Sequence, residues 1–142
     1  MQTNHQQLLI PHLTVDNAIK AIEFYKQGFS AIENLRMPAE DGKRLIHVEL
    51  EINGSKVFIM DDFPDHYPGS IKGKSMTPKA LGGTSVSLHL EVKNCDESFK
   101  RAVNAGAKVV MEPMDAFWGA RYGQVVDPFG HRWSFAHPLP KK

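Results

Sequence analysis

The sequence predicts an α+β fold of paired βαβββ modules, which form a half-barrel sheet around a central cavity. Two observations predict this fold. The stretch HLTVDN, which begins at His12, returns as HLEVKN, which begins at His89. Each copy is followed by a segment of helical periodicity and then by three strand-like runs. One such module covers a single face of its sheet with a helix, so we expect two modules together to enclose a cavity.

The first strand of each module leads into a capped helix. After each strand comes an asparagine whose side-chain oxygen is suited to cap a helix, Asn17 in the first copy and Asn94 in the second. The segments that follow carry apolar residues at helical spacing. A glycine stands near the end of each segment, Gly28 or Gly106, where a residue in the left-handed conformation is expected to stop the helix.

Three further strands are expected in each module. Alternating and β-branched residues place them at 31–37, 45–52 and 56–61 in the first module, and at 108–111, 122–126 and 132–136 in the second. A tight turn joins the last two strands of each set. The first turn is Asn53-Gly54, a strong hairpin signal, and the second is Asp127-Pro128-Phe129-Gly130.

These patterns divide the chain within one domain of residues 1–142. We assign residues 8–62 to the first module and residues 84–138 to the second. Residues 63–83, rich in proline, glycine and lysine, join them. A loop of this length within a small domain is commonly functional, so we expect the linker also to cover the mouth of the cavity.

Composition excludes several classes of function. The formal net charge of +1 provides no field that would attract nucleic acid or an anionic membrane. The single cysteine, Cys95, excludes a disulfide within the chain and a cysteine-rich zinc cluster. No apolar run approaches the ~20 residues that span a bilayer. The amino-terminal MQTNHQQLL lacks the features of a secretory signal. We therefore expect a soluble cytoplasmic protein.

The most specific segment is FWGARYGQVVDPFGHRW, residues 117–133. Together with the paired βαβββ pattern, it resembles the vicinal oxygen chelate superfamily, which includes glyoxalase I, extradiol dioxygenases and bleomycin-resistance proteins. This string and the opening PHLTVDNAIKAIEFYKQGF are similar to the PhnB-like branch. The resemblance covers nearly the whole chain and implies a homodimer. A methyltransferase label attached to that branch finds no support here, because the chain lacks a glycine-rich turn from strand to helix.

For the enzymes of this superfamily, the resemblance implies a divalent metal held by four inward-facing His, Glu or Gln residues. One lies on the first strand and one on the last strand of each module. Carried over strand by strand, these positions hold Ile10, Ile59, Ser87 and Ser134. Isoleucine has no donor atom and a serine hydroxyl is a weak ligand, so we expect the usual metal site to be absent and no cofactor to be bound.

Side-chain alternation suggests another set of inward-facing residues. If Leu13, Val15 and their counterparts pack on the helices, then His12 and His89 face the cavity, and His47 and Glu49 join them. Three interpretations remain open. The histidines are hydrogen-bonded wall residues, which we favour; one of them is a general base near its ordinary pKa of ~6.5; or His12, His89 and Glu49 bind a divalent metal at a site unlike the usual one.

The FWGARYG string has two interpretations of its own. Phe117, Trp118 and Tyr122 could wall a ligand pocket, with Arg121 as a clamp for an anion or a carbonyl group. Alternatively, the string is the structural entry into the last hairpin, with Trp118 in the core and Arg121 paired with an acidic residue. Both are kept.

Four further polar residues are assigned structural roles. Asp127 is expected to bond the backbone of its own turn, and Asp61 and Asp62 to form a charged strand end with side chains on opposite faces. Cys95 stands at a helix start, which could lower its pKa, but no catalytic partner is evident.

Two functions of different classes follow. The first is a binding protein that holds a small organic molecule without the usual metal tetrad. The second is a lyase, isomerase or dioxygenase that uses an unusual metal site, or His12 or His89 in acid–base catalysis. The candidate ligand-binding residues are His12, His47, Glu49, Ser87, His89, Trp118, Arg121, Tyr122 and Ser134.

Overall fold

The computed structural model describes residues 6–141, so part of the amino-terminal stretch considered above lies outside it. The first module contains β1 (His12–Val15), α1 (Ala18–Phe29), β2 (Ile32–Pro38), β3 (Leu45–Ile52) and β4 (Ser55–Asp61). Its sheet has the order β1-β4-β3-β2, in which β1 runs parallel to β4 and the other neighbours are antiparallel.

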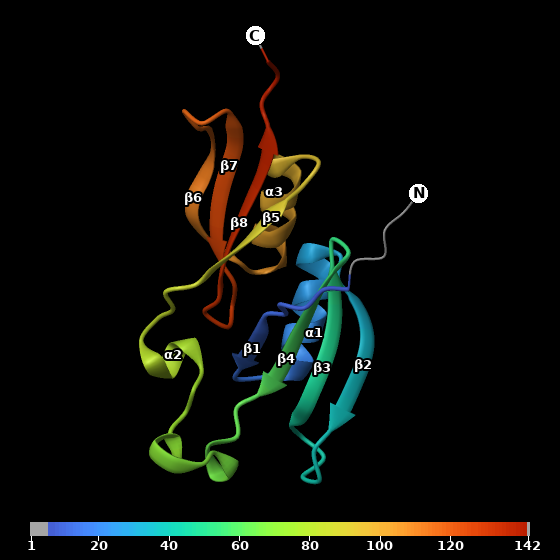
Figure 1. Ribbon diagram of the computed structural model, residues 1–142, viewed down its shortest axis with the longest axis vertical. Helices are drawn as coiled ribbons and strands as arrows, with labels where there is room; N and C mark the ends of the chain where they lie inside the picture. The colour runs from blue at the N-terminus through green and yellow to red at the C-terminus, as the bar shows by residue number, and fades with distance from the viewer. Residues whose placement is uncertain (1–5, 142) are drawn as a thin grey trace.

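The second module repeats this arrangement. It contains β5 (Ser87–Glu91), α3 (Cys95–Ala105), β6 (Lys108–Asp115), β7 (Ala120–Val126) and β8 (Arg132–Pro138). The sheet order is β5-β8-β7-β6, again with a parallel pair formed by the first and last strands. The predicted α+β fold of paired βαβββ modules is therefore confirmed (Figure 1).

Between the modules, the linker contains two short 3₁₀ helices, η1 (Pro64–His66) and η2 (Gly69–Ile71), and the one-turn helix α2 (Pro78–Leu81). Over residues 6–141, no helix is long and apolar enough to cross a membrane.

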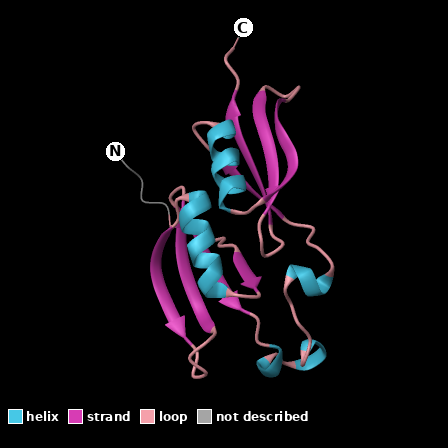
Figure 2. Cartoon of the chain, turned by 180° about the vertical axis from the view of Figure 1, so that it is seen from behind, coloured by secondary structure: helices cyan, strands magenta, loops and turns pink. Residues whose placement is uncertain are grey.

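Both long helices lie on the same side of the two sheets (Figure 2), and α1 packs against α3. Gly28 makes this contact close, because a Cβ atom at this position would lie only 3.0 Å from the Cβ atom of Ala105. We expected the helix to end near Gly28, and it does, but Gly28 is not the left-handed residue that stops it. The helix continues to Phe29, and Ser30 takes the left-handed conformation with φ 55°. Gly28 is instead a residue at which two helices touch.

The other local signals are confirmed. The side chains of Asn17 and Asn94 accept the N–H groups of Lys20 and Glu97, so both cap their helices as predicted. Asn53 and Gly54 both have positive φ, as a tight hairpin turn requires. Strand β6 runs four residues beyond the predicted Met111 and includes Pro113. Since β6 is an edge strand, a proline that lacks an N–H group is tolerated there.

One aromatic core joins the modules behind the sheets. The ring of Phe29, at the end of α1, lies 4.6 Å from that of Trp133 and 5.6 Å from that of Phe135, both on β8. Tyr25 lies 5.7 Å from Trp133, and these four side chains are all buried. The two modules therefore share one hydrophobic core, which is a single unit for stability.

The carboxylate of Asp127 lies within this core. One of its oxygens accepts the N–H groups of Phe129 and His131, which confirms the predicted turn. The other accepts hydrogen bonds from the Tyr25 hydroxyl and the Trp133 indole. Because Tyr25 belongs to the first module, this carboxylate links the two modules as well as closing its own turn.

A second buried carboxylate organises the first module. Asp61 accepts the N–H group of Ala18 at the start of α1, at 2.8 Å, and that of Leu45 at the start of β3, at 2.7 Å. It was expected to be a charged strand end, but only 5% of its surface is exposed. The prediction that Asp61 and Asp62 point in opposite directions holds, since Asp62 bonds with Tyr67, Ser75 and the N–H of Met76 in the linker.

Replacing Tyr25 with phenylalanine tests the link between the modules. We expect this change to lower the free energy of unfolding at pH 7 by about 1–3 kcal/mol, because it removes a hydrogen bond to a buried carboxylate. Urea unfolding followed by circular dichroism would measure it. Tyr122→Phe, on the open face of the second sheet, is the matched control and should change stability less.

The stability difference between the wild type and Tyr25→Phe should depend on pH in a definite direction. Burial and the neighbouring Asp127 raise the pKa of Tyr25 well above its ordinary value of 10.0. The native state then keeps a proton that the unfolded state releases, so this contribution is fully present below pH 10 and is lost as the pH rises further. The difference between wild type and Tyr25→Phe should narrow in alkaline solution. A difference that stays constant up to pH 11 would contradict this assignment.

Candidate functional site

The faces of the two sheets that carry no helix are concave and open on the same side of the chain, toward the viewer in Figure 1. In the first module, register defines this face. Leu35 pairs with Glu49, and Met37 pairs with His47. Along β1 and β4, His12 lies beside Phe58. These pairings turn the side chains of His12, His47 and Glu49 away from the helix, as predicted.

A bulge in β3 adds one more apolar side chain to this face. Pairing passes from Met37 with His47 to Pro38 with Leu45, so Ile46 is left as the extra residue. Leu45 is consequently buried on the helix side while Ile46 is 47% exposed. The position carried over from the superfamily at Ile59 was misplaced. Ile59 pairs with Val48 and is fully buried against the helix, so its neighbours are the residues that face the concave side.

The first-module site is a compact group of rings. The ring centroids of His12 and His47 are 5.8 Å apart, and that of Phe58 lies 5.9 Å from His12 and 4.6 Å from His47. Glu49 approaches His47 at 3.5 Å. Partial burial, and then the proximity of His47, lower the pKa of His12 below its ordinary value of 6.5. His12 is therefore neutral at pH 7 and able to accept or donate a hydrogen bond.

The second-module site centres on His89. Its Nδ1 lies 2.7 Å from the Ser134 hydroxyl, and its Nε2 lies 2.7 Å from the carboxylate of Glu91. The imidazole stacks on the ring of Tyr122, at 6.0 Å between centroids and 20° between planes. Trp118 meets the same tyrosine edge-on at 5.5 Å. Three rings thus form a continuous wall, with His89 bonded at both nitrogens.

Sequence reasoning missed two polar residues beside this wall. Gln124 donates to the Tyr122 hydroxyl at 2.8 Å, and its carbonyl oxygen accepts from Arg132 at 3.0 Å. Gln124 lies two residues after Tyr122 on the same strand, so strand alternation could have placed it on this face. Arg132 is half-buried, and within residues 6–141 no carboxylate forms an ion pair with it. It is therefore a cation available to a ligand.

Arg121 and Trp118 lie apart, although their positions are close in sequence. Arg121 points to the helix side, where it pairs with Asp96 at 2.9 Å and Asp115 at 3.0 Å. Of the two interpretations of Arg121, the structure therefore supports pairing with acidic residues. Arg121 is not free to clamp an anion. Trp118 remains 57% exposed at the end of the β6–β7 hairpin, so it does not fill the core. Ser134 is buried beneath His89, whereas Ser87 is exposed.

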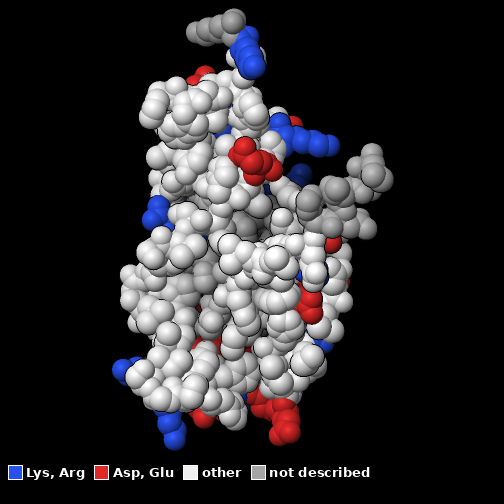
Figure 3. All heavy atoms as spheres, viewed as in Figure 1, with Lys and Arg blue, Asp and Glu red and all other residues white. Residues whose placement is uncertain are grey.

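The open side of the molecule is largely uncharged, with most charged side chains toward its periphery (Figure 3). Apolar side chains stand exposed along the outer strands of both concave faces, namely Ile32, Leu35, Met37, Met111 and Met114. An exposed apolar surface of this kind marks a place where a ligand or another protein binds.

Comparison with known proteins agrees with this architecture. Residues 5–135 match the profile of the Glyoxalase/Bleomycin resistance protein/Dioxygenase superfamily. The chain belongs to this superfamily. An uncharacterized protein of Mycobacterium bovis is 51% identical over 139 residues, which cover 98% of this chain and 88% of that protein.

Two solved structures extend the comparison. TioX from Micromonospora sp. ML1 aligns with a TM-score of 0.72 and 27% identity, over 94% of this chain and 100% of that one. The PhnB protein from Bacillus cereus aligns with a TM-score of 0.66 and 16% identity, over 92% and 99% of the two chains. At that identity, the likeness to PhnB is one of fold.

As a member of this superfamily, the chain can be tested for the metal tetrad by the chemistry of its donors. Ser134 is committed to His89, and Ile10 and Ile59 offer no donor atom. Phe58 and Met60, which flank Ile59, are no better suited to a hard divalent cation. Nor do three His, Cys, Asp or Glu side chains of residues 6–141 gather closely enough to hold a metal. The alternative triad of His12, His89 and Glu49 is therefore not assembled within one chain.

Cys95 is confirmed to begin a helix, but the expected lowering of its pKa was wrong. Burial of the thiol, together with the negative charge of Asp96, raises its pKa to about 11. The thiol donates to the carbonyl oxygen of Phe135 at 3.3 Å. At neutral pH the sulfur is protonated and buried, so it is not a nucleophile.

The titration of His12 tests the first-module site. We expect a midpoint below 6.5, because partial burial and the nearby His47 both disfavour the protonated ring. Long-range ¹H–¹⁵N correlation spectra recorded between pH 4 and 8 would give the value. In His47→Gln, one of the two causes is removed, so the midpoint should rise toward 6.5. A wild-type midpoint above 6.5 would show that the site is arranged differently.

Proposed function

We propose that the protein is a PhnB-like binding protein, which holds a small organic molecule against the concave face of its second module. The observation that carries this proposal is the exposed wall of three rings, Trp118, Tyr122 and His89, on an open sheet face. Flat aromatic surfaces recognise planar ligands, and a few placed polar groups then fix their orientation. Arg132 and Gln124 are suited to supply those groups.

Arg132, beside this wall, favours a ligand that carries a negative charge, while the Glu91 carboxylate is bonded to His89. Arg132 is a guanidinium on the concave face, held by the neutral Gln124 rather than by an acidic residue. A carboxylate matches the fork of a guanidinium with two parallel hydrogen bonds. A planar aromatic carboxylate would therefore stack on the rings and satisfy Arg132 at the same time.

A homodimer is part of the proposal. Because both concave faces open on one side, a single chain leaves them uncovered, together with the apolar residues of β2 and β6. A second copy related by a twofold axis can place its first module over the second module of its partner. Two equal enclosed sites result, since the contact is repeated by symmetry.

Acid–base catalysis by His89 is the second candidate, and one observation favours it. His89 joins the Ser134 hydroxyl and the Glu91 carboxylate, an arrangement that orients and polarises an imidazole. Against it, Ser134 is buried beneath the ring, and Glu91 is strongly exposed to water. The binding proposal requires no reaction from these groups.

Two substitutions on one strand test the dimer. Met111 and Val109 are similarly exposed on β6, but Met111 faces the concave side and Val109 the helix side. We expect Met111→Glu to weaken dimerisation at least tenfold, because it would bury an unpaired charge in an apolar interface. Val109→Glu should leave the dimer intact. Sedimentation velocity over a concentration series would measure both; equal behaviour of the two variants would argue against the proposed interface.

Binding is tested with 2-naphthoate, a planar aromatic carboxylate, by isothermal titration calorimetry. We expect Trp118→Ala to weaken binding roughly tenfold or more, since it removes a large contact surface. Val109→Ala is the control, because this side chain is exposed on the helix side of β6, whereas the Phe117 ring contacts Trp118 edge-on at 5.1 Å.

The metal content of the purified protein, before and after dialysis with Zn²⁺ or Ni²⁺, separates the two functional classes. Stoichiometric metal in the wild type that disappears in His12→Ala and His89→Ala would overturn the binding proposal in favour of a metalloenzyme. If no metal binds and none shifts the thermal midpoint, the metalloenzyme form of the alternative is excluded.

A further inference from the structure

The linker folds back on the first module and is held there by one carboxylate. Asp62 accepts the Tyr67 hydroxyl at 2.7 Å, the Ser75 hydroxyl at 2.6 Å and the N–H group of Met76 at 3.1 Å. These contacts span the two 3₁₀ helices, so the start of the linker has a defined position. Burial alone would raise the pKa of Asp62, but these hydrogen bonds together outweigh it and lower the pKa, which keeps the carboxylate ionised at neutral pH.

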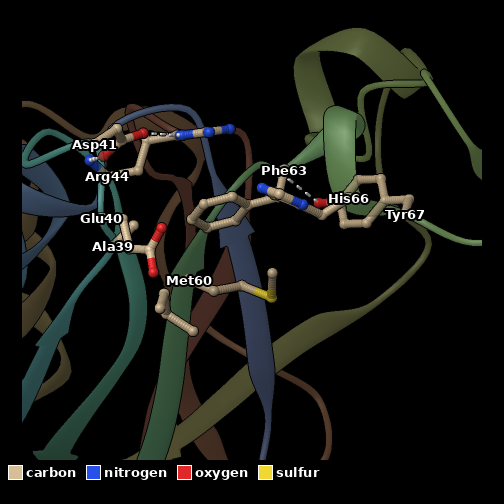
Figure 4. A pocket seen from close by; sticks show the side chains of 9 residues that line it. Ala39, Glu40, Asp41, Arg44, Met60, Phe63, His66 and Tyr67 are labelled. Atoms are coloured by element: carbon tan, nitrogen blue, oxygen red, sulfur yellow. Dashed lines mark hydrogen bonds and ion pairs between the residues drawn. The ribbon is translucent and has the colours of Figure 1, made fainter.

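Between this part of the linker and the ends of β3 and β4 lies a cavity of about 890 Å³ (Figure 4). Its apolar surface comes from Ile46 and Met60 of the sheet and from Phe63 and Tyr67 of the linker. The volume falls within the range of sites that bind drug-sized molecules. None of the ring residues Trp118, Tyr122 and His89 lines it.

Arg44, the positively charged side chain at the rim of this cavity, already has partners. Arg44 stacks on the Phe63 ring, with its guanidinium carbon 4.2 Å from the centroid. It also forms ion pairs with Asp41 at 2.7 Å and with Asp65 at 2.8 Å. The backbone N–H group of Arg44, and then its guanidinium, lower the pKa of Asp41, and the guanidinium brings the pKa of Asp65 to about 2, so both carboxylates remain ionised. Arg44 is therefore not available to an anionic ligand.

A third carboxylate has no such partner. Glu40 lines the cavity, and its carboxylate points inward toward Phe63 and Met60 (Figure 4). Within residues 6–141 no side chain pairs with it. Glu40 and Asp41 line the cavity and Asp65 lies beside it, so three carboxylates stand against the single guanidinium of Arg44. The imidazole of His66, which also lines the cavity, lies 3.2 Å from Asp65. The charge beside the apolar surface is negative on balance, which favours positively charged ligands and disfavours anions.

We propose that this cavity binds a small organic cation, in which an ammonium group is joined to an aromatic or alkyl body. The ammonium group pairs with Glu40, and the apolar body packs on Ile46, Met60 and Phe63. The ring of Tyr67 offers a further surface that attracts a cation. An ammonium that leaves water needs a carboxylate in this way, because its desolvation would otherwise oppose binding.

This inference is independent of the proposed function. The cavity is built by one chain, requires no dimer, and shares no residue with the aromatic wall of the second module. It also selects the opposite charge. The experiments on this cavity therefore do not decide the proposed function, and the experiments on the aromatic wall do not decide this inference. Failure of either proposal can be recognised separately.

The test compares three probes of nearly equal shape: 4-phenylbutylamine, 4-phenylbutanol and 4-phenylbutyrate. Binding to the full chain would be measured by calorimetry, with ¹H–¹⁵N spectra to show which residues respond. We expect the amine to bind roughly tenfold more tightly than the alcohol, the carboxylate to bind least, and the shifts to centre on Ile46, Met60 and Phe63. The preference for the amine should decline as salt is added.

Two substitutions locate the effect. Glu40→Gln should weaken binding of the amine about fivefold and leave the alcohol unchanged, whereas the same change at the exposed Glu112 should affect neither. Ile46→Trp fills the cavity from a position that is 47% exposed, so the fold should tolerate it while both probes lose affinity. The proposal is overturned if the alcohol binds as well as the amine, or if Glu40→Gln and Glu112→Gln behave alike.

Discussion

Four donors converge on the buried carboxylate of Asp127, and they come from three different parts of the fold. Two are N–H groups of its own turn, one is the indole of β8, and one is the hydroxyl of Tyr25 on α1. A charge in the core is tolerated only when it is satisfied in this way. The same carboxylate thereby holds the first module against the second, and with them the relative orientation of both sheets. The opening of both concave faces on one side depends on this junction.

The two faces of each sheet have separate roles. The helix side carries the shared aromatic core, the buried Asp61 and Asp127, and the ion pairs of Arg121. Stability is concentrated there. The concave side carries exposed rings and polar groups that bond mainly to one another, such as Tyr122, Gln124 and Arg132. Changes on the concave side can therefore alter ligand recognition with little effect on folding, because the core lies behind the sheet.

Local patterns in the sequence were sufficient for the modules, the asparagine caps and the two hairpin turns, since each depends on neighbours a few residues away. The misjudged residues depend on distant partners. Ile59 takes its face from its pairing with Val48. Arg121 is neutralised by Asp96 of another element, and the thiol of Cys95 is set by burial against β8. We predicted only that the linker would cover a cavity. The residues that form the walls of the cavity beneath it could not be predicted, because they meet through tertiary contacts alone.

The adjacent aspartates at the end of β4 place a constraint on the length of that strand. Asp61 anchors the starts of α1 and β3 inside the module, while Asp62 holds the linker outside it. Successive side chains of a strand alternate between faces, so insertion or deletion of one residue in β4 would exchange the two carboxylates. Asp61 would then face the linker, and Asp62 would enter the core. The chain can lengthen or shorten here only by an even number of residues, whereas the linker that follows is free of this rule.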